Sequence, residues 1–437
     1  MPASRAHALS PNLLKPALSR RALLAGVSGA LAAGCDARLP PAAAGRQVTT
    51  LWFTYGGKNR EVLEALIARF HELQREVWVR AIYQGDYYEG LAKLRVALAA
   101  GAAPALSHVV GEVVPYLAEA GVLDTLDRFP NLAQVEVVPE LGQKGSWRGG
   151  ATKPLVALPF NRSTPIAYLN GAIFEQAGLA APRTWEELQS VAARLTQRSA
   201  DRTLRYGFGC PIDWWFWTAL VEQAGGSVVE ADGRVSLGDA AGVRALEFWQ
   251  RLVNQDRSMK PPPGRDYNAW EQTNQDFLAG RVAMIWTSTA FLKYLEDNSR
   301  FPVVAAPLPR KQRAAVPTGG THWVILKAAP EAEKLAAARF LEFMTATPQA
   351  ISWATRTGYI PITRPAITEL AAGGHYRRHP NERVAVDQLS VAEPWPWSPR
   401  LFRVQREIIQ PRLEQAVLAS GQAQKLLDEA RKLAREA

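Results

Sequence analysis

The sequence has 437 residues, of which 47% are hydrophobic and 21% are charged, and its formal net charge is +10 at pH 7. This composition is typical of a globular protein and excludes an intrinsically disordered chain, while the length is sufficient for two domains. The basic excess does not indicate a nucleic-acid partner, because such binders concentrate their charge on one face. The dense basic stretches here, 310–313 and 377–378, lie instead in loops bounded by Pro or Gly.

The first 34 residues have the features of a cleaved export signal. Basic residues without any acidic one precede the small apolar run Ala22–Ala33. This run of about 12 residues is well below the roughly 20 that a membrane-spanning helix needs. Arg20 and Arg21, followed by Ala-Leu-Leu, resemble the twin-arginine signal, with the ordinary secretory route as the alternative.

Leu31–Cys35 covers the end of this apolar run and resembles the lipobox of bacterial lipoproteins, in which the cysteine is lipidated and becomes the new N-terminus. Asp36 resembles the mark for retention in the inner membrane of bacteria with two membranes. If Cys35 carries lipid, Cys210 is the only thiol left, so no internal disulfide forms and stability depends on a hydrophobic core. Residues 35–47, rich in Pro and Ala, are then a tether.

Strand and helix patterns alternate after the tether. Val48–Phe53 and Val77–Tyr83 are β-prone apolar runs that predict buried strands. Helices are predicted at Arg60–Gln74 and Leu91–Ala100, and Val109 with Val110 marks a third strand. The apolar face of the first helix comprises Val62, Leu63, Leu66, Ile67 and Phe70. This alternation predicts an α/β lobe on a mainly parallel sheet.

Further helices are predicted in the middle and at the end of the chain. Thr184 followed by Glu187 has the spacing of a capping box, which predicts a helix start. Ala241–Asn254 and Glu331–Thr345 are amphipathic, and Pro411–Ala437 reads as a charged helical tail. These elements predict a compact body without internal repeats.

Motifs typical of enzymes are absent from the sequence. His71-Glu72 lacks the second histidine of a zinc-protease helix, and no P-loop pattern occurs. The six histidines have no spacing that supports a metal site. We therefore expect no catalytic residue, no metal and no cofactor.

Five stretches occur in a consistent order along the chain: Tyr83–Tyr87, Pro159–Asn170, Phe277–Met284, Thr318–Thr321 and Thr357–Thr363. Together they resemble the extracellular solute-binding proteins of ABC transporters (family 1), and the last is similar to the TGYLPI segment of the glycerol-3-phosphate-binding branch. The resemblance implies a monomeric lipoprotein, anchored at the periplasmic face of the inner membrane, that delivers a small molecule to a membrane permease.

The fold that this resemblance implies is an α/β, two-lobed periplasmic-binding-protein fold with a hinged cleft and three inter-lobe crossings. The crossings are expected near Asn161–Tyr168, Trp286–Phe291 and His322–Lys327. The first lobe would then contain residues 48–162 with 288–322, and the second 163–287 with 323–437.

The resemblance also implies ligand contacts, which are Tyr87, Ser163, Ser288, Gly320, Tyr359 and Arg406. Arg406 offers a bidentate donor fork for a phosphate, and Gly320 permits close approach of a backbone N–H. Taken alone, Arg406 could be a surface ion-pair former, the glycine pair a turn, and Tyr359 a core residue.

Two further positions bear on the ligand. Trp215 is the expected stacking residue, with Trp214 second, because the four consecutive aromatic residues 214–217 cannot all face one cleft. The branch carries an acidic residue where this chain has Gly111. Glu112 is its neighbour, but a one-residue shift in a strand would turn that side chain to the opposite face.

The sequence thus favours a protein that binds glycerol-3-phosphate or a glycerophosphodiester. A sugar or oligosaccharide ligand is the alternative, because an aromatic-rich cleft also suits pyranose rings. A lipid-anchored hydrolase is a remote third possibility.

Overall fold

The computed structural model describes residues 39–142, 154–200, 202–230, 234–262, 268–419 and 421–436. The predicted signal segment and Cys35 lie outside these residues. The chain separates into two compact units, residues 1–46 and 47–437, and both five-stranded sheets belong to the second. In the first unit, Pro41–Ala43 forms the single turn η1. No helix in the described ranges is long and apolar enough to span a membrane.

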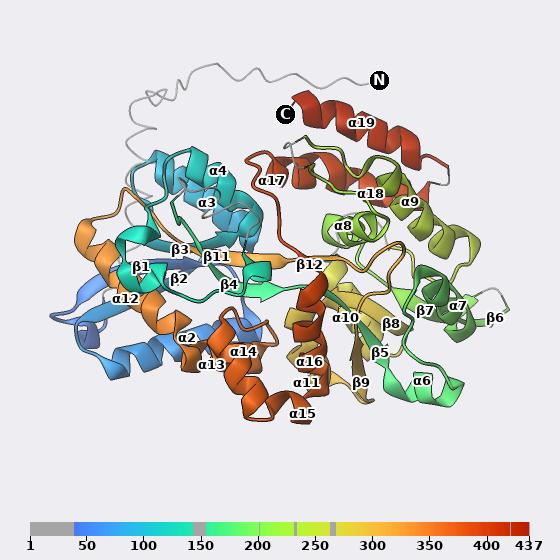
Figure 1. Cartoon of the computed structure of the whole chain (residues 1–437), viewed down its shortest axis with the longest axis horizontal. Helices are drawn as coiled ribbons and strands as arrows, with labels where there is room; N and C mark the ends of the chain where they lie inside the picture. The colour runs from blue at the N-terminus through green and yellow to red at the C-terminus, as the bar shows by residue number, and fades with distance from the viewer. Residues whose placement is uncertain are drawn as a thin grey trace, which may run out of the picture. The chain divides into compact units, whose positions relative to one another are not determined.

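The first sheet has the strand order β2-β1-β3-β11-β4 (Figure 1). Its strands are β1 (Gln47–Phe53), β2 (Val77–Tyr83), β3 (Leu106–Val110), β4 (Leu158–Ser163) and β11 (Gly319–Ile325). β1 pairs in parallel with β2 and β3, whereas β11 runs antiparallel to β3 and β4. The predicted α/β start of the chain is therefore confirmed.

Helices cover this sheet with the apolar faces that their sequences predict. α2 (Gly57–Leu73) buries all five residues of its predicted face. α3 (Tyr87–Ala99) begins at Asp86, whose Oδ1 accepts the backbone N–H groups of Tyr88 and Glu89 at 2.7 and 2.8 Å. The other helical segments of this part are η2 (Gly111–Val113), α4 (Val114–Glu119), η3 (Leu126–Arg128), α5 (Pro130–Ala133), η4 (Pro139–Leu141), α12 (Glu331–Thr345) and α13 (Thr347–Thr357).

The second sheet has the order β6-β7-β8-β5-β9. Its strands are β5 (Pro165–Asn170), β6 (Gln197–Ser199), β7 (Arg202–Gly209), β8 (Val282–Ser288) and β9 (Val303–Ala306). The capping box at Thr184 is confirmed in part, since its hydroxyl accepts the backbone N–H of Glu187 at 3.1 Å and starts α7 (Trp185–Leu195). The other helices before residue 300 are α6 (Gly171–Ala177), α8 (Trp214–Gln223), α9 (Asp239–Gln250), η5 (Arg251–Gln255), α10 (Ala269–Leu278), η6 (Thr289–Phe291) and α11 (Leu292–Asn298).

The chain passes between the two sheets at three places, of which the sequence located only the first. β4 and β5 are separated by Thr164 alone, within the predicted crossing 161–168. After β8, however, η6 and α11 lead back to β9 of the same sheet, so residues 286–291 are not a crossing. The second crossing instead covers residues 307–318, between β9 and β11.

The predicted third crossing at 322–327 is also wrong, because β11 stays paired with β3 through Ile325. α12 and α13 then pack on β1 and α2, whereas α16 (Pro380–Asp387) packs on β9. The third crossing therefore follows α13, at Gly358 and the residues after it. By sheet membership, β9 groups with the second sheet and residues 323–357 with the first, which differs from the lobe boundaries expected from the sequence.

The C-terminal segment returns to both parts of the structure. α17 (Leu401–Arg403) contacts η2, while α18 (Gln410–Leu418) and α19 (Ala423–Glu436) pack on α9. The π-helical turn η8 (Val404–Ile409) joins them and carries Arg406. The remaining elements are β10 (Val316–Pro317), α14 (Arg364–Ala372), α15 (His375–Arg378), η7 (Gln388–Val391) and β12 (Ala392–Glu393).

Candidate functional site

Asn161 on β4 brings together two of the predicted contact residues. Its Nδ2 donates to the hydroxyl groups of Tyr87 at 3.2 Å and Tyr359 at 3.4 Å. Its Oδ1 accepts the backbone N–H of Thr321 at 2.7 Å, which ties β4 to β11. Tyr87 at the start of α3 and Tyr359 at the third crossing thus lie on either side of one amide, although they are separated by 272 positions.

Gly320 and Ser163 lie beside this amide. Gly320 has φ +99°, and a Cβ added there would lie 1.8 Å from the backbone oxygen of Asn161. Only glycine satisfies both restrictions, so the position has a packing reason in addition to the predicted ligand contact. Ser163 is buried and pairs with Gly319 at the end of β4, next to the first crossing.

The tryptophans of α8 are placed differently from each other. Trp215 is buried, and its Nε1 donates to the backbone oxygen of Thr318 at 3.2 Å. A Cβ on Gly319 would lie 2.6 Å from the Trp215 ring, so this indole packs directly on the second crossing. Trp214 is only partly buried and packs on Trp395, with ring centroids 5.1 Å apart. This arrangement favours Trp215 over Trp214 as the residue nearest the glycine pair.

Ser288 ends β8 and caps the turn that follows. Its Oγ accepts the backbone N–H of Ala290 at 3.1 Å, and its backbone pairs with Pro165. The hydroxyl hydrogen is therefore free to donate, and Ser288 lies next to the first crossing, as Ser163 does.

Arg406 has a guanidinium group whose N–H donors are not used by its neighbours in the described ranges. Its Cζ lies 3.5 Å from the centroid of the Tyr88 ring, which is a cation–π contact. In the ranges that the structure describes it forms no hydrogen bond and no ion pair. The side chain is partly buried, and its charge acts on Asp213. Arg406 can therefore direct several N–H donors toward an anion.

Glu112 is a buried acid that lies just beyond the end of β3. The strand rule does not apply to it, because β3 ends at Val110 and residues 111–113 form the 3-10 turn η2. Glu112 is 5% exposed, and its charge acts on Tyr87, Tyr88 and Arg162. The signal available in the sequence was its place just beyond a parallel strand, where side chains from neighbouring strands converge.

Desolvation is the largest influence on the pKa values of Glu112 and Asp213. It raises the pKa of Glu112 to about 7, while the residue's own backbone N–H and the charge of Arg162 oppose the rise. Burial likewise raises the pKa of Asp213 to about 6, against the hydrogen bond from the Trp215 backbone and the charge of Arg406. Asp213 also caps α8, with its Oδ1 2.9 Å from the Trp215 nitrogen.

A pH-dependent stability follows from the pKa of Glu112. Because the folded-state pKa exceeds the unfolded value, the folded state binds more protons between pH 4.5 and 7, and stability falls as the pH rises through this window. Glu112→Gln removes the cost of ionisation. We expect the ligand-free variant to melt a few degrees above wild type at pH 8 and at the wild-type temperature at pH 5. An equal difference at both pH values in differential scanning calorimetry would contradict this assignment.

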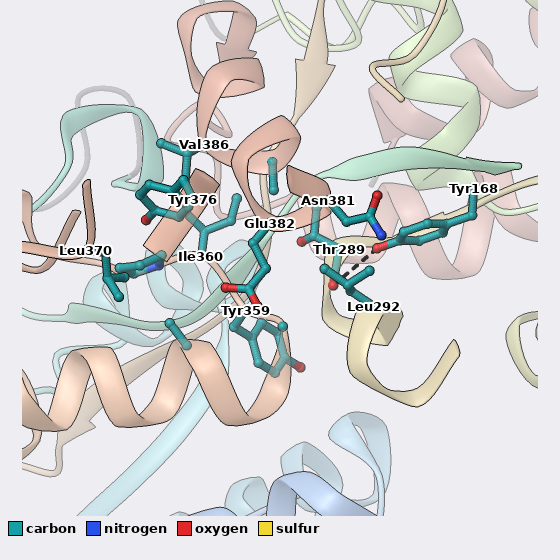
Figure 2. Close-up of a pocket in the computed structure, with 14 residues that line it drawn as sticks. Tyr168, Thr289, Leu292, Tyr359, Ile360, Leu370, Tyr376, Asn381, Glu382 and Val386 are labelled. Carbon is teal, nitrogen blue, oxygen red and sulfur yellow. Dashed lines mark hydrogen bonds between the residues drawn. The ribbon is translucent and has the colours of Figure 1, made fainter. Parts of the chain in front are cut away.

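A separate pocket lies beside the third crossing, and Figure 2 shows it. Tyr168, Tyr376 and Glu382 line it together with Tyr359, and the Tyr168 hydroxyl donates to the backbone oxygen of Thr289 at 3.4 Å. Neither Arg406 nor Trp215 belongs to its lining. In the described ranges no group of three or more His, Cys, Asp or Glu side chains could hold a metal ion.

Comparison with known proteins extends this picture. A model of the family described as bacterial extracellular solute-binding protein matches residues 65–376. The sn-glycerol-3-phosphate-binding periplasmic protein UgpB of Salmonella typhimurium is 24% identical over 374 residues, which are 80% of this chain and 83% of that protein.

Solved structures agree on the fold. UgpB from Mycobacterium tuberculosis, solved in complex with glycerophosphocholine, has a TM-score of 0.77 at 24% identity and covers 90% of this chain and 98% of its own. The GacH receptor of Streptomyces glaucescens, solved unliganded and with acarbose, has a TM-score of 0.78 at 18% identity over the same shares of 90% and 98%. Since the family model covers more than half of the chain, this protein belongs to the bacterial extracellular solute-binding protein family, as the ordered stretches of its sequence implied.

Proposed function

We propose that this protein is the substrate-binding protein of an ABC importer and that it captures glycerol-3-phosphate or a glycerophosphodiester between its two sheets. The observation that carries the proposal is the guanidinium of Arg406 over the Tyr88 ring, where the charges of Asp213 and Glu112 also act on Tyr88. A fixed planar cation with free donors matches the oxygens of a phosphoryl group. The named ligand of the Salmonella relative supports the same chemistry.

The other residues of the site contact different parts of the ligand. Tyr87 and Tyr359 present hydroxyl groups beside Asn161, and Ser288 has a hydroxyl hydrogen to donate. Glu112 replaces the acidic residue that the related branch has at the position of Gly111. Its carboxylate accepts a hydrogen bond from a hydroxyl or another donor in the non-phosphate half of the ligand. Trp215 walls the site at the glycine pair.

A sugar or oligosaccharide is the second candidate, and a specific cluster favours it. Trp215, Phe216 and Trp270 pack together, with the Trp270 ring centroid 5.5 Å from Trp215 and 5.0 Å from Phe216. Flat aromatic faces of this kind also suit pyranose rings. A thermal-shift screen of phosphate esters against maltose-like sugars separates the two, because only the bound class raises the melting temperature.

The protein delivers its ligand to a permease and performs no chemistry in this proposal. The sequence carries no motif typical of a hydrolase, and the described residues of the site are binding groups without an activated nucleophile. Incubation with glycerophosphocholine should therefore release no choline. Release at a rate above the buffer control would instead favour the lipid-anchored hydrolase.

We further propose that Cys35 is lipidated and holds the protein at the periplasmic face of the inner membrane. The support is the lipobox-like run Leu31–Cys35 behind a basic leader. Cys35→Ser should move the protein from the membrane fraction to the soluble periplasmic fraction after cell fractionation. Equal partition of wild type and variant would contradict lipidation.

A further inference from the structure

Arg162 on β4 is a fully buried cation that forms no ion pair with any residue that the structure describes. Its side chain is 0% exposed, and its Nη1 is buried without a hydrogen-bond partner in the part of the chain that the structure describes. The charge of Glu112 acts on it, but the two side chains are not joined by a salt bridge. The sequence analysis did not single out Arg162, although it assigned a ligand contact to the next residue, Ser163.

Two hydrogen bonds hold the guanidinium of Arg162 in a fixed orientation. Nε donates to the backbone oxygen of Leu141 at 2.9 Å, and Nη2 donates to Oγ1 of Thr318 at 2.8 Å. The backbone oxygen of Arg162 accepts the N–H of Ile360 at 2.9 Å. Thr318 ends the second crossing and Ile360 lies in the third, so Arg162 is fixed where the crossings meet. Nη1 is the guanidinium nitrogen that has no hydrogen-bond partner among the described residues.

An uncompensated buried cation is costly, because the desolvation of a charge is repaid only by a partner of opposite charge or by several hydrogen bonds. Burial lowers the pKa of Arg162 to about 10, so the group is still charged at neutral pH. His322 on the neighbouring strand β11 also has two buried ring nitrogens, neither of which has a hydrogen-bond partner among the described residues. Burial and the charge of Arg162 lower the pKa of His322, so this ring stays neutral and gives no repulsion toward an anion.

The position of Arg162 links it to the candidate site. Asn161 holds Tyr87 and Tyr359, and Gly320 pairs with Arg162 itself across β4 and β11. The charge of Arg162 also acts on Tyr87. Arg162 is therefore flanked in β4 and paired across β11 by residues of the candidate site, and its charge reaches Tyr87.

We propose that Arg162 is a second anion-binding arginine of the ligand site, whose Nη1 donates to an oxygen of the phosphoryl group that Arg406 approaches from η8. This inference rests on the proposed function, since it takes the ligand to be a phosphate ester. Two cations from different segments favour an anionic ligand over a neutral sugar. Arg162 is also hydrogen-bonded to Thr318 in the second crossing and to Ile360 in the third, so a bound phosphoryl group would contact a residue that is fixed to both crossings.

The test uses two substitutions of Arg162 in the full-length mature protein. Arg162→Met removes the charge at similar volume, and Arg162→Gln removes the charge but can still donate to Leu141 or Thr318. Arg205→Met is the control, because Arg205 is partly buried and, like Arg162, donates from Nε to a backbone oxygen, that of Leu195, but lies on β7 of the second sheet. Titration calorimetry with sn-glycerol-3-phosphate and with glycerophosphocholine measures binding, and calorimetric melting of the ligand-free proteins measures stability.

We expect both Arg162 variants to bind the phosphate esters about 10- to 150-fold more weakly than wild type, as the loss of a charge-assisted hydrogen bond predicts. Their ligand-free melting temperatures should equal or exceed that of wild type, because an unpaired buried charge has been removed. Arg205→Met should bind as wild type does. If Arg162→Met does not fold, Arg162→Gln decides the matter.

The inference is overturned if a folded Arg162→Gln binds the phosphate esters as tightly as wild type does. A lowered melting temperature in the same variant would show that Arg162 stabilises the crossings instead. That result would leave the proposed function standing. Failure of the wild-type protein itself to bind either phosphate ester would instead remove the proposed function, so the two failures are distinguishable.

Discussion

Arg406→Ala is expected to weaken the binding of a phosphate ester by at least about tenfold and by up to about 150-fold. The reason is that the Arg406 guanidinium lies over the Tyr88 ring and, among the described residues, spends none of its N–H donors on a hydrogen bond. Its loss removes a charge-assisted, bidentate contact and leaves the core unchanged. Arg406→Lys should recover only part of the affinity, because a point charge does not reproduce the planar fork. Titration calorimetry with sn-glycerol-3-phosphate gives the measurement.

Arg403→Ala is the matched control for this substitution. Arg403 lies one turn earlier, is exposed, and pairs with Glu407 at 3.2 Å, which is an ordinary surface ion pair. Its removal should leave affinity and melting temperature close to wild type. Unchanged binding by Arg406→Ala would place the phosphate site elsewhere and favour the sugar ligand.

Gly320→Ala is expected to cause the largest loss of stability, on the order of 3 kcal/mol or more. Two costs combine: φ is +99°, and the new Cβ would meet the backbone oxygen of Asn161 at 1.8 Å. Backbone on two paired strands cannot yield as a flexible side chain does, so β4 and β11 must separate locally. We expect the melting temperature to fall by about 5 °C or more.

Gly280→Ala isolates the contribution of backbone conformation alone. Gly280 has φ +69°, but a Cβ there would meet nothing within 4 Å. This control should therefore lose about 1–2 kcal/mol, the usual cost of a left-handed conformation outside glycine. If Gly320→Ala loses no more than Gly280→Ala, the close approach of β4 to β11 does not constrain this position.

The elements that local patterns determine were predictable from the sequence. The apolar face of α2 follows from helical periodicity, and the start of α7 follows from the hydroxyl of Thr184. The residues near the first crossing were identified by a motif that covers both adjoining strands. Each of these signals lies within about a dozen residues of the feature it predicts.

The predictions that failed concern features that depend on contacts between distant segments of the chain. β11 stays in the first sheet because it pairs with β3, more than 200 residues earlier, and no local pattern carries that information. The strand argument about Glu112 failed because this residue lies beyond the end of β3, in the turn η2. Arg162 was missed because its significance lies in what it fails to contact, which only three-dimensional placement reveals.

The most direct test of the central claim is titration calorimetry of the wild-type mature protein with sn-glycerol-3-phosphate, glycerophosphocholine and maltose in parallel. We expect saturable binding of at least one phosphate ester, and no binding of maltose at the same concentrations. Saturable binding of maltose together with no heat from either phosphate ester would contradict it.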